Sequence, residues 1–190
     1  MINIWSQILS DVDKTIVKEP ILKSFLQKTI SNHDNLYDAT VNYLTNKLNF
    51  EFLSECEVQT IFREAIKNSD FIKEAITQDL IAIKERDPAS KNYLDPFLNF
   101  KGFHSLISYR VANWLWNNNR PQLALLFQSQ ISKTFAVDIH PGAKIGIRVF
   151  FDHATSIVIG ETAVVGNDVS MLHEVTLGGT GNHTGDRHPK

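Results

Sequence analysis

A potential acid–base pair interrupts an apolar segment of the chain. In the stretch VFFDHATSIVIGET, residues 149–162, Asp152 and His153 follow two phenylalanines and precede an Ile-Val-Ile run. Histidine ordinarily has a pKa of about 6.5, so near neutral pH its imidazole can take a proton from a hydroxyl group. The pair therefore indicates a candidate general base. A polar turn, or a structural histidine bound to a neighbouring carbonyl, is the alternative interpretation.

A six-residue repeat surrounds this pair. A unit this short cannot bury its own face, so successive units must stack into a solenoid. Six residues per face, with a column rich in small residues at the corners, predict a left-handed parallel β-helix. His153 falls in an otherwise apolar column of this repeat, and such an exception requires a cause. The principal apolar column is Ile139, Ile145, Phe151, Ile157, Ala163, Val169 and Val175.

The residues that precede the repeat have helical patterns. Ser54 lies three residues before Glu57, which is a capping-box signature, and apolar residues recur at helical spacing in 102–117. In all we expect roughly seven or eight short helices. The predicted fold is therefore α+β, with an all-α helical domain followed by a left-handed parallel β-helix. The predicted boundaries are 1–136 for the helical domain and 137–190 for the β-helix.

The composition is that of an ordinary folded protein. The 190 residues are 43% hydrophobic and 21% charged, and the net charge is −2 with no run of lysine or arginine. These values give no electrostatic reason to expect binding to nucleic acid or to a membrane surface. No apolar window is long enough for a membrane span, and the N-terminus lacks the pattern of a signal peptide. A single cysteine, Cys56, predicts a reducing compartment and hence a cytoplasmic protein.

Several short motifs follow one another in a fixed order along the chain. They are RDPA at 86–89, KGFHSL at 101–106, DIHPGAKIG at 138–146, DHAT at 152–155, GETAV at 160–164, and VTLGGTG followed by GDRHPK. In order and spacing they resemble those of the serine O-acetyltransferase family, the hexapeptide-repeat acyltransferases of cysteine biosynthesis. The resemblance extends over the whole chain. It implies transfer of the acetyl group of acetyl-CoA to the hydroxyl of L-serine, which gives O-acetyl-L-serine and CoA. It also implies acetyl-CoA as the co-substrate and no metal.

The resemblance assigns catalytic roles to two of these residues. His153 matches the base of the family, and Asp138 matches the carboxylate that holds the imidazole in the useful tautomer and stabilises its charged form. Gly178 and Gly179 match a loop that helps to build the site, so they are the expected CoA contacts. Taken without the resemblance, Asp138 would be interpreted as a turn residue and the glycines as part of a surface loop.

The resemblance also implies how L-serine is held. Asp87 and Asp152 would face the ammonium and hydroxyl end, while Arg187 and His188 would hold the carboxylate, because a guanidinium pairs two-pronged with a carboxylate. Each residue has a simpler interpretation. Asp87 precedes Pro88 and would make a good helix N-cap. Asp152 could be a solvated corner, and the other two could belong to an ordinary surface loop.

The family resemblance implies a homo-oligomer. Such solenoids form trimers with the active site at the seam between neighbours, and in this family the helical domains join two trimers into a hexamer. The family's chain continues beyond the position of Lys190 with further coils, which supply much of the CoA site, and with a tail that docks the next enzyme of the pathway. We therefore expect a C-terminally truncated member that does not dock that enzyme, and its activity is an open question.

Three alternatives remain open at this point. One is a hexapeptide acyltransferase with another hydroxyl acceptor, such as a sugar or an antibiotic. A second is an inactive truncated module that only assembles. A third is a metal-dependent solenoid that resembles the γ-type carbonic anhydrases, since histidine is a common zinc ligand. Against this last alternative, residues should stack every eighteen positions, whereas His153 and His173 are twenty apart. The remaining histidines near the repeat are His140, His183 and His188.

Overall fold

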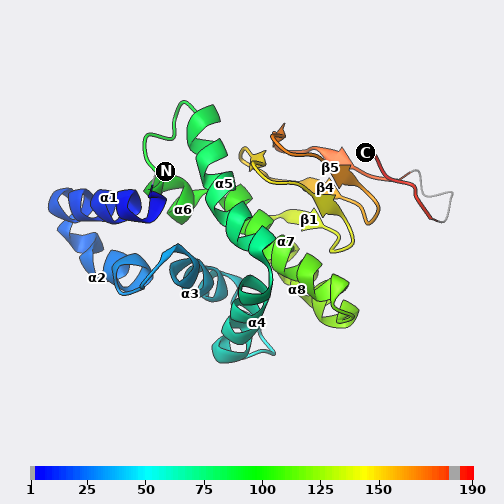
Figure 1. Ribbon diagram of the computed structural model, residues 1–190, viewed down its shortest axis with the longest axis horizontal. Coiled ribbons are helices and arrows are strands. Elements are labelled where there is room, and N and C mark those ends of the chain that lie inside the picture. The colour runs from blue at the N-terminus through cyan, green and yellow to red at the C-terminus, as the bar shows by residue number, and fades with distance from the viewer. Residues whose placement is uncertain (1–2, 180–184) are drawn as a thin grey trace.

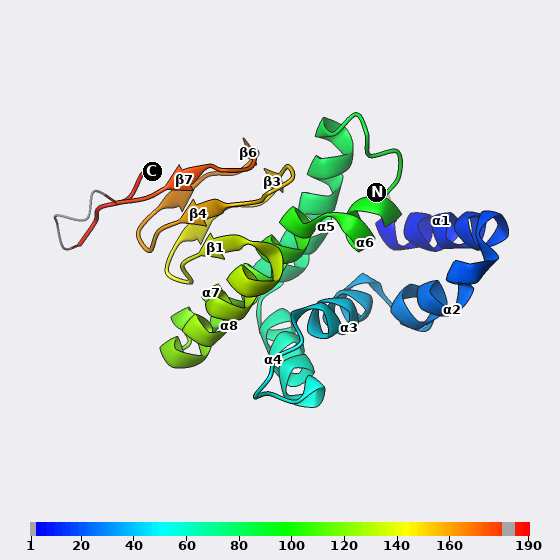
Figure 2. The ribbon, with the colours of Figure 1, turned by 180° about the vertical axis from the view of Figure 1, so that it is seen from behind.

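The computed structural model describes residues 3–179 and 185–190, with helices in the first part and short parallel strands in the second (Figure 1). Helix α7 lies at the centre, with α1–α4 on one side and the strands on the other (Figures 1 and 2). The helical elements are α1 (Ile4–Lys18), η1 (Pro20–Leu22), α2 (Lys23–Leu26), η2 (Gln27–Ser31), α3 (Leu36–Leu48), α4 (Glu55–Asn68), α5 (Asp70–Arg86), α6 (Leu94–Asn99), α7 (Lys101–Asn117) and α8 (Pro121–Phe135).

Local sequence signals set several helix ends. The predicted capping box of α4 is confirmed: the Ser54 hydroxyl accepts the Glu57 amide at 3.3 Å, and the Glu57 carboxylate accepts the Ser54 amide at 2.8 Å. Helix α8 begins at Pro121, a residue whose missing N–H is no loss at a first helical position. It ends where Ala136 turns into the left-handed region at a φ of 54°, and the first strand follows directly.

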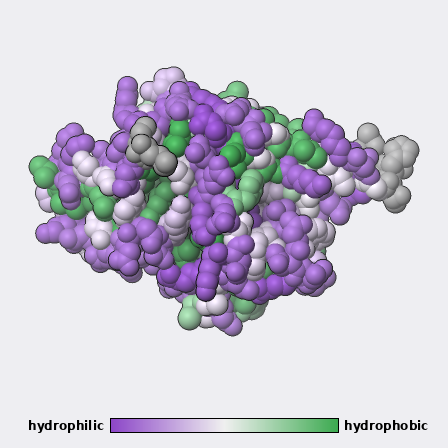
Figure 3. All heavy atoms as spheres, in the orientation of Figure 1, coloured by the Kyte–Doolittle hydropathy of each residue, from purple (hydrophilic) through white to green (hydrophobic). Residues whose placement is uncertain are grey.

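The core is continuous from the helices into the strands. Helix α7 packs against helices α8, α5 and α4 and also contacts strands β1 and β3. Most of its residues are buried, from Gly102 to Leu115. The face seen in Figure 3 is largely hydrophilic. Among the described residues, no helix has both the length and the apolar character that a membrane span requires.

The strands form three small parallel sheets. Consecutive strands enter different sheets, and the sheets recur in the same order along the chain: β1-β4-β7, β2-β5 and β3-β6. Figure 2 shows β1, β4 and β7 side by side, with β3 beside β6. The strands are β1 (Val137–Ile139), β2 (Lys144–Ile145), β3 (Phe150–Phe151), β4 (Ile157–Ile159), β5 (Val164–Val165), β6 (Ser170–Met171) and β7 (Thr176–Leu177).

The register of these sheets corrects the predicted six-residue column. Ile139 pairs with Ile159, a step of 20 residues, whereas Ile159 pairs with Leu177, a step of 18. The difference arises after β3: from Phe151 to Ile159 is eight residues, and the equivalent step from Met171 to Leu177 is six. Two extra residues therefore lie between β3 and the end of β4. The predicted column is therefore wrong beyond Phe151. The neighbouring columns are also apolar, so apolar character alone does not reveal the shift.

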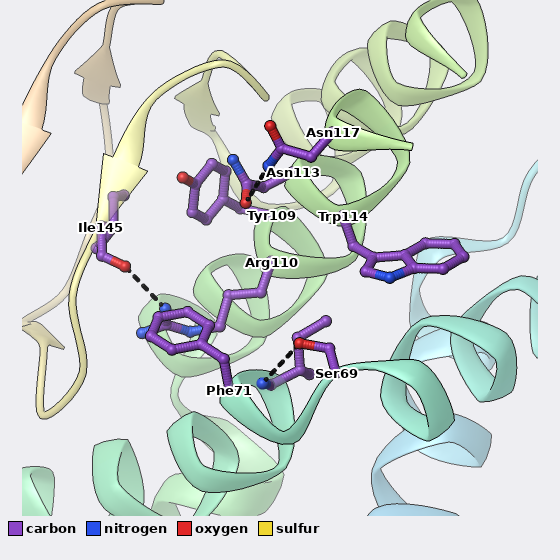
Figure 4. A pocket seen from close by; sticks show the side chains of 9 residues that line it. Ser69, Phe71, Tyr109, Arg110, Asn113, Trp114, Asn117 and Ile145 are labelled. Atoms are coloured by element: carbon purple, nitrogen blue, oxygen red, sulfur yellow. Dashed lines mark hydrogen bonds between the residues drawn. The ribbon is translucent and has the colours of Figure 1, made fainter. Parts of the chain in front are cut away.

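Side chains of α7 satisfy the carbonyl groups of the first coil, which has no preceding coil to pair with. The Tyr109 hydroxyl donates to the Ala143 carbonyl at 2.5 Å. Arg110 Nη1 donates to the Ile145 carbonyl at 3.1 Å, as Figure 4 shows. Arg110 also forms a fully buried ion pair with Asp79 at 2.8 Å. Buried carbonyls need such partners, so α7 fixes the first coil against the helices.

Candidate functional site

Three of the predicted site residues lie around one cavity. Asp87, Asp152 and His153 line a space of about 530 Å³ between the C-terminal end of α5, the N-terminal end of α7 and the end of β3. Asp87 is separated from the other two by more than sixty residues of sequence, and the fold brings them together. The other lining residues are Ala89, Asn99, Phe100, Lys101, Gly102 and Phe151.

Asp87 ends a helix, so its alternative interpretation as an N-cap is wrong. Its amide donates to the Ile83 carbonyl at 2.8 Å, which closes α5, and its carboxylate Oδ1 accepts the Ala89 amide at 2.8 Å. The residues after Asp87 form a turn, because the proline that follows disfavours helical geometry in the residue before it. The turn uses one carboxylate oxygen, and Oδ2 accepts no hydrogen bond from the described residues.

His153 lies in the two-residue insertion, outside any apolar column. Its φ of 55° is left-handed, its side chain is 75% exposed, and its Nε2 lies 3.7 Å from Asp152 Oδ1. The Asp152 amide donates to the Met171 carbonyl at 2.8 Å, which ties the loop to the next coil. A left-handed conformation at a residue with a Cβ costs of order 1 kcal/mol. The insertion thus holds the imidazole clear of the core and beside a carboxylate.

A second histidine lies beside the first. The rings of His153 and His173 meet edge to face, with centroids 6.1 Å apart and planes inclined at 75°. The expectation that a spacing of twenty prevents stacking is wrong, because the first coil has twenty residues. The described residues nevertheless contain no group of three or more His, Cys, Asp or Glu side chains placed to hold a metal ion. His183 lies outside the described residues.

The start of α7 supports the loop that carries His153. Lys101 Nζ donates to Thr155 Oγ1 at 2.5 Å. A Cβ added to Gly102 would lie 2.1 Å from the Phe151 carbonyl oxygen, so the helix and β3 are in direct backbone contact here. Gly102 belongs to the KGFHSL motif, but the sequence pattern assigns it no role. A glycine near the start of an otherwise apolar helical pattern was the available signal.

Asp138 lies apart from His153 in this chain. Its carboxylate Oδ1 accepts a hydrogen bond from Gln128 Nε2 at 2.7 Å, and it lines a separate cavity of about 490 Å³ along α8. Within the described residues no hydrogen bond joins its carboxylate to the imidazole. Its role as the partner of the base stays a prediction.

Arg187 and His188 form a second group of predicted site residues, and they pack against the turn between β4 and β5. His188 Nδ1 accepts the Thr162 amide at 3.2 Å and lies 2.8 Å from the Thr162 hydroxyl. The Arg187 guanidinium lies 3.8 Å from the carboxylate of Glu161. The His188 ring lies over Gly160, where a Cβ would come within 2.0 Å of it. Neither residue lines the cavity of Asp152 and His153.

The two predicted CoA contacts follow β7. Gly178 and Gly179 are exposed, and a Cβ on Gly179 would lie 3.1 Å from Cγ of Arg187. Gly179 thus approaches the second group. The remainder of the glycine-rich loop, 180–184, lies outside the described residues.

Comparisons with known proteins give one consistent family. The family model described as "Serine acetyltransferase, N-terminal" matches residues 4–108. Serine acetyltransferase 1, chloroplastic, of Arabidopsis thaliana is 47% identical over 99% of this chain and 60% of its own length. Serine acetyltransferase of Haemophilus influenzae is 46% identical over 100% of this chain and 71% of its own length.

Solved structures agree with these relatives. The structure titled "Soybean Serine Acetyltransferase Complexed with Serine" superposes with a TM-score of 0.95 at 45% identity, over 98% of this chain and 77% of that one. The structure titled "Serine Acetyltransferase- Complex with CoA" gives a TM-score of 0.93 at 46% identity, over 98% and 78%. The chain thus spans only part of each relative, from 60% of the Arabidopsis protein to 78% of this last structure. Because the match covers nearly every residue of the chain at close to half identity, the chain belongs to the serine acetyltransferase family.

Proposed function

We propose that the chain is a serine O-acetyltransferase, which transfers the acetyl group of acetyl-CoA to the hydroxyl of L-serine. The observation that carries the proposal is the cavity at which Asp87, Asp152 and His153 converge. It presents two carboxylates for an ammonium group and an exposed imidazole for a hydroxyl. Relatives solved with serine and with CoA support the same pair of substrates.

In the proposed reaction His153 is the general base. The imidazole takes the hydroxyl proton as the serine oxygen attacks the thioester carbonyl, which forms the C–O bond. The C–S bond then breaks, CoA leaves as a thiolate, and the imidazolium returns the proton to sulfur. The products are O-acetyl-L-serine and CoA. Base catalysis of this kind contributes typically about 10²–10⁴-fold to the rate.

Asp87 and Asp152 are proposed to bind the serine ammonium group, and Arg187 and His188 its carboxylate. A carboxylate and an ammonium group form charge-assisted hydrogen bonds, which are about twice as strong as neutral ones. Asp138 is proposed to orient the imidazole of His153.

We propose that the complete site forms between copies of the chain in a trimer. Its support is that the two groups of predicted residues lie at separate places in one chain, so a neighbouring copy would bring the second group to the first. A further contact between helical regions would pair trimers into a hexamer. Apolar side chains exposed at the α1–α2 end support this contact: Val17 is 81% exposed, Ile21 87% and Phe25 45%.

The proposed fold of residues 137–190 is a left-handed parallel β-helix, joined to a helical domain at 1–136. The recurring order of three parallel sheets supports the β-helix. The left-handed Ala136 between α8 and β1 supports the boundary. Gly178 and Gly179 are proposed to contact acetyl-CoA.

The test is free-thiol release from acetyl-CoA with and without L-serine. We expect serine-dependent release that falls at least about 10²-fold in His153→Ala. His33→Ala is the matched control, because His33 is a half-buried histidine that does not line the cavity and whose ring lies 3.2 Å from the nearby Lys28 carbonyl. Equal rates in both variants would refute the role of His153. Thiol release that depends on a sugar in place of serine would favour an acyltransferase with another hydroxyl acceptor. Loss of activity on addition of a chelator would favour the metal-dependent alternative.

A further inference from the structure

Four charged side chains join the end of α5 to the first two coils. Arg86 Nη2 and Arg148 Nε share one oxygen of Asp168, at 2.6 and 2.7 Å. Arg148 Nη2 also binds the Glu85 carboxylate at 2.6 Å. We call these four residues, Glu85, Arg86, Arg148 and Asp168, the α5 clamp.

The α5 clamp adjoins both walls of the candidate serine cavity. On one side, Arg86 directly precedes Asp87. On the other, Arg86 Nη1 donates to the Arg148 carbonyl at 3.0 Å, two residues before β3, and to Ser170 Oγ at 3.3 Å in the paired strand β6. Asp152 directly follows β3 and is tied to β6 through its amide.

The corner positions of the α5 clamp carry a conformational cost. Arg148 and Asp168 have φ values of 60° and 61°, in the left-handed region that favours glycine. Charged residues occupy these stacked corners although each costs of order 1 kcal/mol in backbone strain. Their side chains therefore supply something that glycine would not.

The charged side chains of the α5 clamp interact as a network and not as isolated pairs. The side chains are partly exposed, from 24% for Arg86 to 56% for Asp168, and an isolated pair of this kind contributes at most about 1 kcal/mol. Here two guanidinium groups share one carboxylate. Hydrogen bonds to Glu85 and Asp168 raise the pKa of Arg148, and the hydrogen bond from Arg148 lowers the pKa of Asp168. Both shifts favour the charged forms of Arg148 and Asp168.

We infer that the α5 clamp is a positioning device that fixes Asp87 relative to Asp152 and so sets the affinity for the ammonium group of the acceptor. The inference rests on the proposed function. An ammonium group held by two carboxylates needs both oxygens within about 3 Å of its nitrogen. A small shift of α5 would lose one of these contacts and leave the imidazole and the thioester side untouched.

The test uses Asp168→Asn, which keeps the size of the side chain and removes the charge shared by the two arginines. We expect the KM for L-serine to rise about tenfold while the KM for acetyl-CoA changes less than about twofold. Asp168→Glu should recover most of the affinity. Glu64→Gln is the matched control, because Glu64 forms a partly exposed ion pair with Arg120 at 3.0 Å, away from the cavity.

A second measurement is independent of activity. The Ala89 and Ser90 amides donate to Asp87 in the turn that follows α5. Their hydrogen exchange should accelerate about tenfold in Asp168→Asn and stay unchanged in Glu64→Gln. Unchanged exchange would overturn the inference whatever the activity.

The kinetic outcomes separate the two proposals. An unchanged KM for serine in an active Asp168→Asn protein would also overturn the inference, as would an equal rise in both KM values. Absence of serine-dependent thiol release in the unaltered chain, together with no serine binding by calorimetry, would instead refute the proposed function.

Discussion

Replacing Gly102 by alanine tests the contact that places the candidate base. Gly102 is the second residue of α7, and an added Cβ would lie 2.1 Å from the Phe151 carbonyl oxygen and 2.9 Å from the Phe151 Cβ. The first contact is with backbone, so no rotation of a side chain can relieve it. Either α7 or β3 must move, and Asp152 and His153 directly follow β3.

The expected change in stability is opposite in sign to that of a glycine-to-alanine change at an ordinary helical position. At an exposed helical position, glycine to alanine stabilises by about 0.5–1 kcal/mol. Overpacking of a close contact costs about 1–3 kcal/mol. For Gly102→Ala we therefore expect a net loss of about 2 kcal/mol in the free energy of unfolding. In a chain of this length that corresponds to a fall of about 4–8 °C in Tm.

The assay is urea unfolding followed by tryptophan fluorescence, with Tm from calorimetry. Gly166→Ala is the matched control, because a Cβ there would meet nothing within 4 Å. The control should unfold within about 0.5 kcal/mol of the unaltered protein. If Gly102→Ala were as stable as the unaltered protein or more so, the reasoning about this backbone contact would be refuted.

Two further predictions concern histidines. His104 is 1% exposed, its Nε2 lies 2.7 Å from the Phe97 carbonyl, and burial lowers its pKa to about 4. Between this value and the unfolded pKa of 6.5 only the unfolded chain binds the proton, so stability is full above pH 6.5 and is lost as the pH falls toward 4. Over that pH range the unaltered protein should lose about 3 kcal/mol more of its free energy of unfolding than His104→Gln, as measured by urea titration. The same dependence of stability on pH in both proteins would contradict this prediction. Gly160→Ala should displace the His188 ring and raise the KM for L-serine about tenfold with little change in Tm; an unchanged KM would argue against His188 as a carboxylate contact.

Patterns within one segment were sufficient for a large part of the fold. The capping box at Ser54 and Glu57 is present, and a helical region is followed by parallel strands, as predicted. These features depend on neighbours a few positions apart, so the sequence displays them directly. The candidate site residues Asp87, Asp152 and His153 came from motifs, and the fold brings them to one cavity.

The tertiary structure alone decided how the coils stack and what faces the cavity. Consecutive apolar columns conceal a two-residue insertion, because only hydrogen bonding between strands distinguishes a twenty-residue step from one of eighteen. That insertion takes His153 out of the core and puts it against His173. Likewise, nothing near Asp168 in sequence indicates Arg86, which lies 82 positions away. Such contacts depend on how distant segments pack, so local pattern could not predict them.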